Sequence, residues 1–548
     1  MGTHTGQSSM SNQSLADFCQ TRKITVTLCA TEANGSTAPY HSIMQSKHAT
    51  RSHYPAWRIG IVVGFATTVV MWLIAFFLHL QGLTAEPWLT GVALILAQTG
   101  GSVIAGRYAS RDRAAWKLGL ATGLTTSVLN LLILGSVLTE PVRVQADQAV
   151  RPDAGIMVAG YLSIGVVIGI VGAMLGSRFL ASDEKTDFED SSHDRWVSRF
   201  AWVAAFAVVP VLFTGGLTTS NQAGLAVPDW PNTYATNMFL YPVASMTGGK
   251  LYEHTHRLFG SLAGVAALGL FLYTLTAWIG AKRADSDRSR FYGVATLLSF
   301  GAGLAVLVQG VIGGFRVVLA DGSTDQESWS NAVEAMPEIS RSLALTTDNT
   351  TSLGLAVVHG ITGQLTFAFL CVIACVLSVR WARTAAFAGK ADGLLRLAAP
   401  AFLVTAVLQL SLGSVTRHFQ HTHALYSHIG FSVIVTGLAF FVAGRAVLRH
   451  GDSRPLPLLG RGVLGVVFLQ FCLGWVALMV VVPHYDEALG TTPLTAERPA
   501  SSVLVATMHQ MTGAALLALG AMLTVWTFRL VAPGSARSSE QARVPVPA

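Results

Sequence analysis

The chain has 548 residues, of which 51% are hydrophobic and only 12% are charged. Soluble domains carry roughly 25% charged residues, and long apolar runs recur along almost the whole chain, so composition excludes an ordinary soluble protein. The formal net charge of +7 does not indicate nucleic-acid binding, because the basic residues cluster in alternate short loops. We therefore expect a polytopic helical protein whose surroundings are the lipid bilayer, with no nucleic-acid partner.

Residues 1–55 are polar and rich in Ser, Thr and Asn. They lack the apolar segment of a cleavable signal peptide, so we expect a disordered cytoplasmic tail. Two of the five cysteines lie in this tail and three lie inside apolar runs: Cys19 and Cys29, then Cys371, Cys375 and Cys472. None lies in a predicted outer loop, so no disulfide framework is expected.

Four apolar runs follow the tail, and each is long enough to cross a bilayer as a helix. They cover about residues 58–80, 88–106, 115–138 and 156–180. We assign residues 56–180 to an additional four-helix membrane unit of unknown role, because we find no chemical motif in it. The charged stretch at 181–199 is predicted to be a cytoplasmic linker.

Eight more apolar runs complete the chain, at about residues 200–217, 257–280, 291–316, 353–379, 394–415, 424–447, 459–483 and 502–530. The predicted fold is therefore an all-α polytopic membrane protein with about twelve transmembrane helices. Lys and Arg concentrate in the loops around 281–290, 380–396 and 445–461, which should face the cytoplasm. The acidic loop at 317–350 and the loop at 218–252 should lie outside.

The last eight runs contain an internal repeat. HGITG at 359–363 is echoed by HQMTG at 509–513, and QGVIGG at 309–314 by QFCLGW at 470–475. GGLTTS at 215–220 has a looser echo in LGSVTR at 412–417. The pattern predicts two tandem four-helix-bundle repeats, residues 200–380 and 394–531, followed by a tail at 532–548. Because four spans is an even number, an axis along the membrane normal should relate the copies.

A histidine lies near the start of four of these helices: His256, His359, His428 and His509. An imidazole at the edge of the hydrocarbon layer is costly and usually functional. Facing imidazoles in a helix bundle commonly hold a haem iron, and the predicted topology places all four at one depth, in two pairs. Any one of them alone is more often a cap or an interfacial residue. That second interpretation is preferred for the neighbouring His254, His418, His421 and His423.

Two charged residues flank the first of these histidines. Glu253 lies one helical turn before His256, so the two side chains should share a face. A carboxylate there could move protons or stabilise positive charge, or simply favour the helix dipole. Arg257 is a candidate partner for a haem propionate. The preceding loop contains GLAVPDWPNTY, whose prolines stiffen it around Trp230, either as a lid over a cavity or as an interfacial anchor.

GGLTTSNQAGLAVPDWP, EHTHR, QGVIGGFRV and the two H-x-x-T-G stretches together resemble the haem A synthase family over roughly residues 196–531. The resemblance implies an enzyme that oxidises a methyl group of haem O to a formyl group, giving haem A for cytochrome oxidase. It implies that His256 and His359, with Arg257, bind the substrate haem. It also implies that His428 and His509 ligate a tightly bound haem b, and that Glu253 is the catalytic outer carboxylate.

The resemblance also implies partners and a location. These are haem O synthase as the upstream donor, the cytochrome oxidase assembly machinery, an unidentified electron acceptor, and the inner membrane of a bacterial cell. The first outer loop lacks the cysteine pair of some bacterial members, so a mechanism that needs those thiols cannot operate here. His428 is chosen as the haem b ligand because it is the last histidine before the uninterrupted apolar run, and His423 is the alternative.

Two other functions stay open at this point. A di-haem membrane cytochrome b would only transfer electrons, but that task favours haems near both faces, whereas the four histidines map to one face. A haem or solute transporter without enzymatic activity is supported only by the duplication.

Overall fold

The computed structural model describes residues 55–80, 86–110, 114–135, 138, 150–180, 194–320 (except 235, 243, 244 and 287), 349–484 and 498–533. The expected N-terminal tail with Cys19 and Cys29, most of the linker, most of the acidic loop at 317–350 and nearly all of the C-terminal tail lie outside the described residues. Within the described ranges, regular structure is helical apart from single bridge residues, of which Thr233 and Thr236 pair with each other. The predicted all-α class is confirmed.

Twelve long helices occupy the predicted positions in the described part of the chain. The first four are α2 (Ala56–Leu78), α3 (Pro87–Gly106), α4 (Ala115–Leu134) and α5 (Ala154–Phe179). The next four are α6 (Arg195–Ser220), α7 (Gly249–Arg283), α8 (Ser289–Val318) and α11 (Asn349–Val376), and the last four are α13 (Gly393–Phe419), α14 (Thr422–Arg449), α15 (Pro455–Val480) and α16 (Ala500–Leu530). Three short helices were not predicted: η3 (Met238–Leu240), α12 (Val379–Arg383) and η5 (Val482–His484).

Eleven of the described helices are long and apolar enough to cross a membrane. The twelfth expected span coincides with α4, which is not among them and which carries Lys117 near its start and a buried Asn130. Side chains such as Leu96, Ile156 and Leu297 leave more than half of their surface exposed on the outside of the helices. Exposed apolar surface on this scale suits lipid, so the chain is an integral, multi-pass membrane protein.

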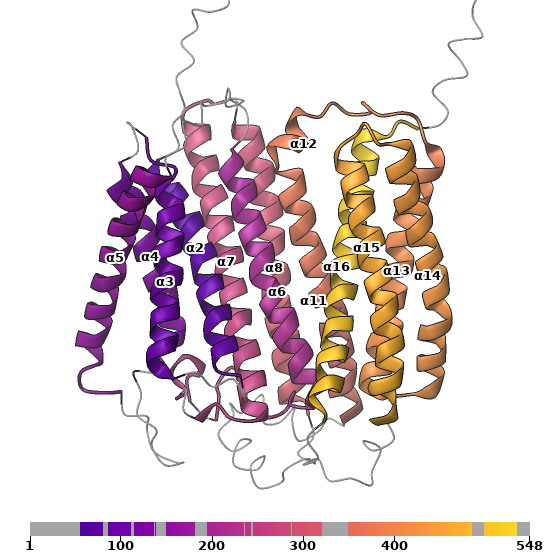
Figure 1. The fold of residues 1–548 in the computed structure, drawn as a ribbon, viewed down its shortest axis with the longest axis horizontal. Helices are drawn as coiled ribbons and strands as arrows, with labels where there is room; N and C mark the ends of the chain where they lie inside the picture. The colour runs from indigo at the N-terminus through magenta and orange to yellow at the C-terminus, as the bar shows by residue number, and fades with distance from the viewer. Residues whose placement is uncertain are drawn as a thin grey trace, which may run out of the picture. The chain divides into compact units, whose positions relative to one another are not determined.

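The helices lie side by side in three groups that follow the chain order (Figure 1). The N-terminal unit consists of α2–α5, which contact one another. The first bundle is a ring in which α6 contacts α7, α7 contacts α8, α8 contacts α11, and α11 contacts α6. The second bundle is a ring of α13, α14, α15 and α16, closed in the same way. The two bundles meet through α6 and α11 on one side and α13 and α16 on the other.

Small residues allow the helices of the N-terminal unit to pack closely. Gly165 and Gly169 of α5 face Gly123 and Gly119 of α4. A Cβ added at Gly119, Gly123 or Gly169 would collide with the opposing backbone, and one added at Gly165 would collide with the Ser127 side chain. Close approach of this kind is the usual packing of helices in lipid, because no hydrophobic effect drives apolar surfaces together there. Polar side chains bond across the same unit, and the amide of Gln98 donates to the Gly165 carbonyl at 3.0 Å.

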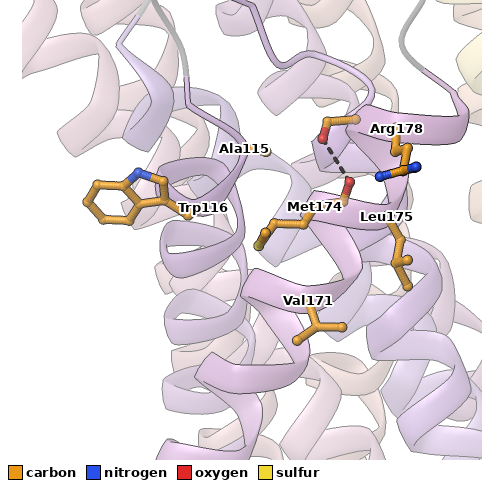
Figure 2. Close-up of a pocket in the computed structure, with 7 residues that line it drawn as sticks. Ala115, Trp116, Val171, Met174, Leu175 and Arg178 are labelled. Atoms are coloured by element: carbon orange, nitrogen blue, oxygen red, sulfur yellow. Dashed lines mark hydrogen bonds between the residues drawn. The ribbon is translucent and has the colours of Figure 1, made fainter.

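An open groove of about 570 Å³ lies between the start of α4 and the end of α5 (Figure 2). Its lining is mostly apolar and includes Trp116, Met174 and Leu175, with Arg178 and Ser177 nearby. The only hydrogen bond drawn there joins the Ser177 hydroxyl to the Met174 carbonyl within α5. None of the described residues that line this groove is a histidine, so it does not include the paired histidines that the sequence indicates.

The start of α6 differs from the sequence expectation. The linker was expected to extend to residue 199, but α6 already begins at Arg195. Asp194 caps the helix by accepting a hydrogen bond from the Trp196 amide at 2.8 Å. Its other oxygen accepts from the Tyr292 hydroxyl at 2.9 Å and lies 3.6 Å from an Arg58 nitrogen. Burial raises the pKa of the Asp194 carboxyl. The acidic residue that marked a linker in the sequence is therefore a buried cap.

Candidate functional site

Two pairs of histidine rings face each other, one pair inside each bundle. In the first bundle, the ring centres of His256 on α7 and His359 on α11 are 6.1 Å apart, and the ring planes are 88° from parallel. In the second bundle, the ring centres of His428 on α14 and His509 on α16 are 6.3 Å apart, with an angle of 82°. All four residues lie within the first three turns of their helices. The two pairs thus have nearly the same geometry.

In each pair, a backbone carbonyl of the preceding helix holds one of the two rings in orientation. Nδ1 of His256 lies 3.0 Å from the Val211 carbonyl oxygen, and Nδ1 of His428 lies 3.1 Å from the Gln409 carbonyl oxygen. Donation of the Nδ1 proton to a carbonyl leaves Nε2 as the lone-pair nitrogen. Histidines that bind a metal usually have such a partner on the other ring nitrogen.

A glycine lies against each of the four rings. In each case, the residue four positions before the glycine has a backbone carbonyl that orients the ring or lies next to it. A Cβ added at Gly215 would lie 2.8 Å from Cε1 of His256, and one added at Gly413 would lie 2.7 Å from Cε1 of His428. The corresponding distances are 3.0 Å for Gly313 and His359, and 3.3 Å for Gly474 and His509. A side chain at Gly215 or Gly413 would force the neighbouring ring to move, whereas one at Gly313 or Gly474 would require a shift of only a few tenths of an ångström. Sequence comparison noted the repeated motifs that contain these glycines but gave the glycines no role.

The contacts also revise the register of the loosest motif pair. Sequence comparison aligned GGLTTS at 215–220 with LGSVTR at 412–417, which sets Gly216 against Gly413. In the structure Gly215, not Gly216, takes the position of Gly413, because each contacts the histidine of the following helix. This register also matches Thr218 with Thr416, whose hydroxyls each donate to the carbonyl four residues earlier.

The other two repeated motifs pack against each other. The amide of Gln309 on α8 donates to the Thr362 hydroxyl on α11 at 2.5 Å. The same pair of residue types, Gln470 on α15 and Thr512 on α16, is joined by a hydrogen bond in the second bundle. Each threonine lies one turn after a paired histidine, so these bonds fix the histidine-bearing helix against its neighbour. The Q-x-x-x-G and H-x-x-T-G motifs thus contact each other in both bundles.

The histidine pairs fit a haem iron better than a bare metal ion. An imidazole nitrogen binds a metal at roughly 2 Å, and the ring centre lies about 1 Å farther, so two axial imidazoles have centres roughly 6 Å apart. Among the described residues, no group of three or more His, Cys, Asp or Glu side chains is placed to hold a metal ion. Two ligands per site are sufficient when a porphyrin supplies the other four.

Glu253 and Arg257 are both engaged with the loop between α6 and α7. One oxygen of the buried Glu253 accepts a hydrogen bond from the Val227 amide at 2.8 Å, and the other accepts from Arg257 at 2.8 Å. Arg257 also donates to three carbonyls of this loop, at 2.7–2.9 Å: those of Asp229, Asn232 and Val227. The expected contact of Arg257 with a haem propionate stays a prediction, because its guanidinium N–H groups donate to loop carbonyls in this structure. Likewise, Glu253 is directed to the loop, whereas the His256 ring is directed to α6.

The loop of residues 221–248 packs against both α7 and α8. The Trp230 ring covers Gly314, the residue after the glycine that faces His359. Arg316 of α8 donates to the Gly224 carbonyl at 2.7 Å, and the Tyr234 hydroxyl donates to the Ala226 carbonyl at 2.5 Å. Burial, together with nearby acidic groups, raises the pKa of the Tyr234 phenol, so it remains a donor. Of the two interpretations, the loop contacts favour a fixed lid beside the first histidine pair.

The additional histidines fall into three kinds, of which the first is His418, half-buried near the end of α13. His254 was expected at an interface, but it is fully buried, its Nδ1 lies 3.1 Å from the Thr233 hydroxyl, and its ring packs on Tyr241. It therefore belongs to the anchoring of the lid. His421 and His423 are exposed. The structure pairs His428, and not His423, with His509.

Sequence analysis missed a set of hydrogen bonds, made by Arg417, that joins the two bundles. Arg417 of α13 donates to Gln510 of α16 at 2.6 Å, and to the Gly216 carbonyl and Ser220 hydroxyl of α6 at 2.8 and 2.6 Å. Gln510 follows His509, and Gly216 follows the glycine that contacts His256. A guanidinium thus lies between the two histidine pairs. The only signal in the sequence was its place in the loosely repeated LGSVTR motif.

No family model, curated protein or solved structure matches this chain.

Proposed function

We propose that this protein is a haem A synthase, a membrane oxidoreductase that oxidises a methyl group of haem O to a formyl group. The observation that carries the proposal is the pair of matched histidine sites combined with one difference between them. Residues 221–248 form a fixed lid beside His256 and His359, whereas only two residues connect α13 to α14 beside His428. Two sites of the same construction suit a substrate site and a cofactor site, because a long loop covers the first and, among the described residues, only a short α13–α14 connection adjoins the second.

The two sites then have different tasks. His256 and His359 would hold the iron of haem O, the substrate, and His428 and His509 would hold a tightly bound haem b. When bound, haem b supplies a one-electron redox centre close to the substrate site. Conversion of a methyl group and water to a formyl group releases four electrons and four protons. An unidentified acceptor must therefore receive the electrons.

The residues of this chain would bind, orient and shield the substrate. The carbonyls of Val211 and Gln409 fix the tautomer and the plane of the ligand rings. The lid excludes water from the outer end of the first bundle, which strengthens electrostatic interactions there. Glu253 is the acid–base candidate, since it is the buried carboxylate nearest in sequence to the ligand His256. Arg257 holds the lid and would meet a propionate only after releasing loop carbonyls.

We also propose that the two bundles are tandem repeats related by an axis along the membrane normal. Four matched features support this: the paired rings, the orienting carbonyls, the facing glycines and the Gln–Thr bond. The domain boundaries inferred from the sequence follow from the same proposal, with α6 as the first helix of the first repeat.

The proposed location is the inner membrane of a bacterial cell, with haem O synthase as donor and the cytochrome oxidase assembly machinery as recipient. The loops around 281–290, 380–396 and 445–461 would face the cytoplasm, and the lid would face outside. The histidine pairs would therefore lie near the outer side of the membrane, together with the lid, and the basic loops would lie on the opposite side.

This orientation predicts a labelling pattern. In a cysteine-free variant, Thr247→Cys in the lid should react with a membrane-impermeant maleimide in intact cells, whereas Asp285→Cys between α7 and α8 should react only after lysis. Both positions are exposed, so accessibility to solvent does not distinguish them. Labelling of the position-285 cysteine in intact cells would reverse the topology.

Extraction of the bound porphyrins tests the function directly. Purified protein from cells that make haem O should yield haem b together with haem O or haem A, identified by chromatography and mass. Two equivalents of haem b and nothing else would indicate the di-haem cytochrome b. Absence of any porphyrin, in protein that is folded and purified from haem-replete cells, would indicate a transporter. The cytochrome is the weaker candidate because both pairs lie near the same ends of the helices.

A further inference from the structure

The N-terminal unit shares a continuous buried core with the first bundle. Its helix α2 contributes aromatic rings to this core. Phe65 contacts Phe200 of α6, with ring centres 5.0 Å apart. Nearer the other end of α2, Phe76 contacts Phe213 of α6 at 6.4 Å and Phe259 of α7 at 6.1 Å. These rings are buried or packed against buried rings, so α2 is an integral part of the wall of the first bundle.

The rings that Phe76 contacts lie next to the residues that hold His256. Phe213 lies between Val211, whose carbonyl accepts from His256, and Thr214, whose hydroxyl lies 3.4 Å from the same Nδ1. Phe259 is one turn beyond His256 on α7. A single layer of helix therefore separates Phe76 from the His256 ring. Both helices that set the position of this ring are contacted by the same side chain of α2.

The second bundle has a different arrangement. The main contacts of α2 are with α3, α4, α6 and α7. Most buried residues of the second bundle belong to a second core, although α16 also contributes residues to the core that contains α2. The His428 ring is oriented by the same kind of carbonyl and glycine contact, without an aromatic brace from α2. The contacts of Phe76 with Phe213 and Phe259 therefore act on the first histidine pair, and the second pair serves as an internal reference.

We propose that Phe76 is a positioning residue for His256, and that the N-terminal unit acts through it to hold α6 and α7 at the spacing that the substrate-haem site needs. This inference rests on the proposed function for its chemical meaning, but the packing claim is independent of any haem. It gives residues 56–180 a specific task that their sequence does not reveal. The side chain is not proposed as a catalytic residue, because it is apolar and its described ring contacts are with Phe77, Phe213 and Phe259.

The test compares Phe76→Ala with Phe65→Ala. The two phenylalanines lie on the same helix, are 5% and 6% exposed, and pack on the same neighbour, α6. They are separated by about 16 Å along the helix axis, so only Phe76 is at the level of His256. Both variants should lose similar thermal stability. Phe76→Leu serves as a milder variant if the alanine variant does not fold.

The first readout needs no haem. Haem-free protein is treated with diethyl pyrocarbonate, and modification of His256 is measured by mass spectrometry relative to His428. The ratio should rise several-fold in Phe76→Ala, because the His256 ring loses its fixed contact with the Val211 carbonyl. It should stay at the wild-type value in Phe65→Ala. Equal ratios in the two variants would overturn the proposal, whether or not the protein is a haem A synthase.

The second readout uses the haem-loaded protein. The low-spin ferric haem signal of the first bundle should shift or broaden in Phe76→Ala, while that of the second bundle stays unchanged. Haem A per molecule should fall by roughly ten-fold, the lower end of the loss seen when a partner that orients a ligand is removed. If wild-type protein contains no haem O or haem A, the proposed function fails, and the reactivity of His256 still decides the packing claim.

Discussion

Replacing either His428 or His509 with alanine is expected to release the haem b that we propose for the second bundle. The two rings lie 6.3 Å apart, centre to centre, in the geometry that two axial ligands of one iron require. Loss of either ring leaves a single protein ligand. The affinity for haem b should fall by more than the roughly 10- to 100-fold that is lost when a residue that orients a metal ligand is removed. The absorption spectrum of purified protein, with haem quantified per molecule, measures this.

The control is His423→Ala on the same helix. His423 is exposed, and it was the alternative ligand when only the sequence was considered. Its replacement should leave the haem b spectrum unchanged. If His428→Ala and His509→Ala both retain a wild-type spectrum, the assignment of the second pair is wrong. If His423→Ala alone loses the haem, the helix start must rearrange when haem binds.

The order and type of the helices could be predicted because each apolar run in this sequence is long, and polar connections separate the runs. The four paired histidines could be found because each stands near the start of such a run. Their pairing could also be predicted, since the repeated motifs fixed which helices are equivalent. These are local or periodic signals, which remain visible without knowledge of how helices contact one another.

The remaining features depend on contacts between distant segments. Asp194 appears in the sequence as one more acid in a charged linker, and only its contacts with Arg58 and Tyr292 identify it as a buried cap. The burial of His254 requires the lid to fold over it. Arg417 contacts α6, which lies about two hundred residues earlier in the chain. No property of a single segment indicates these partners.

The glycines illustrate the same limit at finer scale. Gly215 and Gly216 are adjacent and chemically identical, and the sequence alone does not indicate which of them corresponds to Gly413. The rotation of α6 against α7 determines which of them faces His256. A rotation of one residue in a helix is about 100°, so a small error in register changes the function assigned to a residue.

The last prediction separates catalysis by Glu253 from its part in holding the lid. Glu253→Gln is expected to reduce haem A formation by about 100-fold or more, within the range of general acid–base catalysis. The carboxylate accepts from both the Val227 amide and Arg257. Glutamine preserves the size and one acceptor, so folding and haem b retention should persist. A hydroxylated intermediate should accumulate if the carboxylate assists the later oxidation or the loss of water.

Arg257→Gln is the matched control because it removes the other partner of the same buried ion pair. Breaking such a pair from either side typically costs about 3–5 kcal/mol, so both variants carry a comparable stability loss. Arg257→Gln also removes three hydrogen bonds to loop carbonyls. If Glu253 only anchors the lid, Arg257→Gln must therefore be at least as damaging as Glu253→Gln.

If Glu253 takes part in the reaction, Glu253→Gln should be the more damaging of the two variants. Chromatographic analysis of the haems, normalised to the amount of each variant that retains haem b, gives haem A per folded molecule. The chemical role requires Glu253→Gln to be clearly lower than Arg257→Gln by this measure. Near wild-type haem A in Glu253→Gln would show that the carboxylate is not needed for the reaction. The carboxylate would then only anchor the loop beside His256. The protons released in the reaction would have to be accepted by other groups.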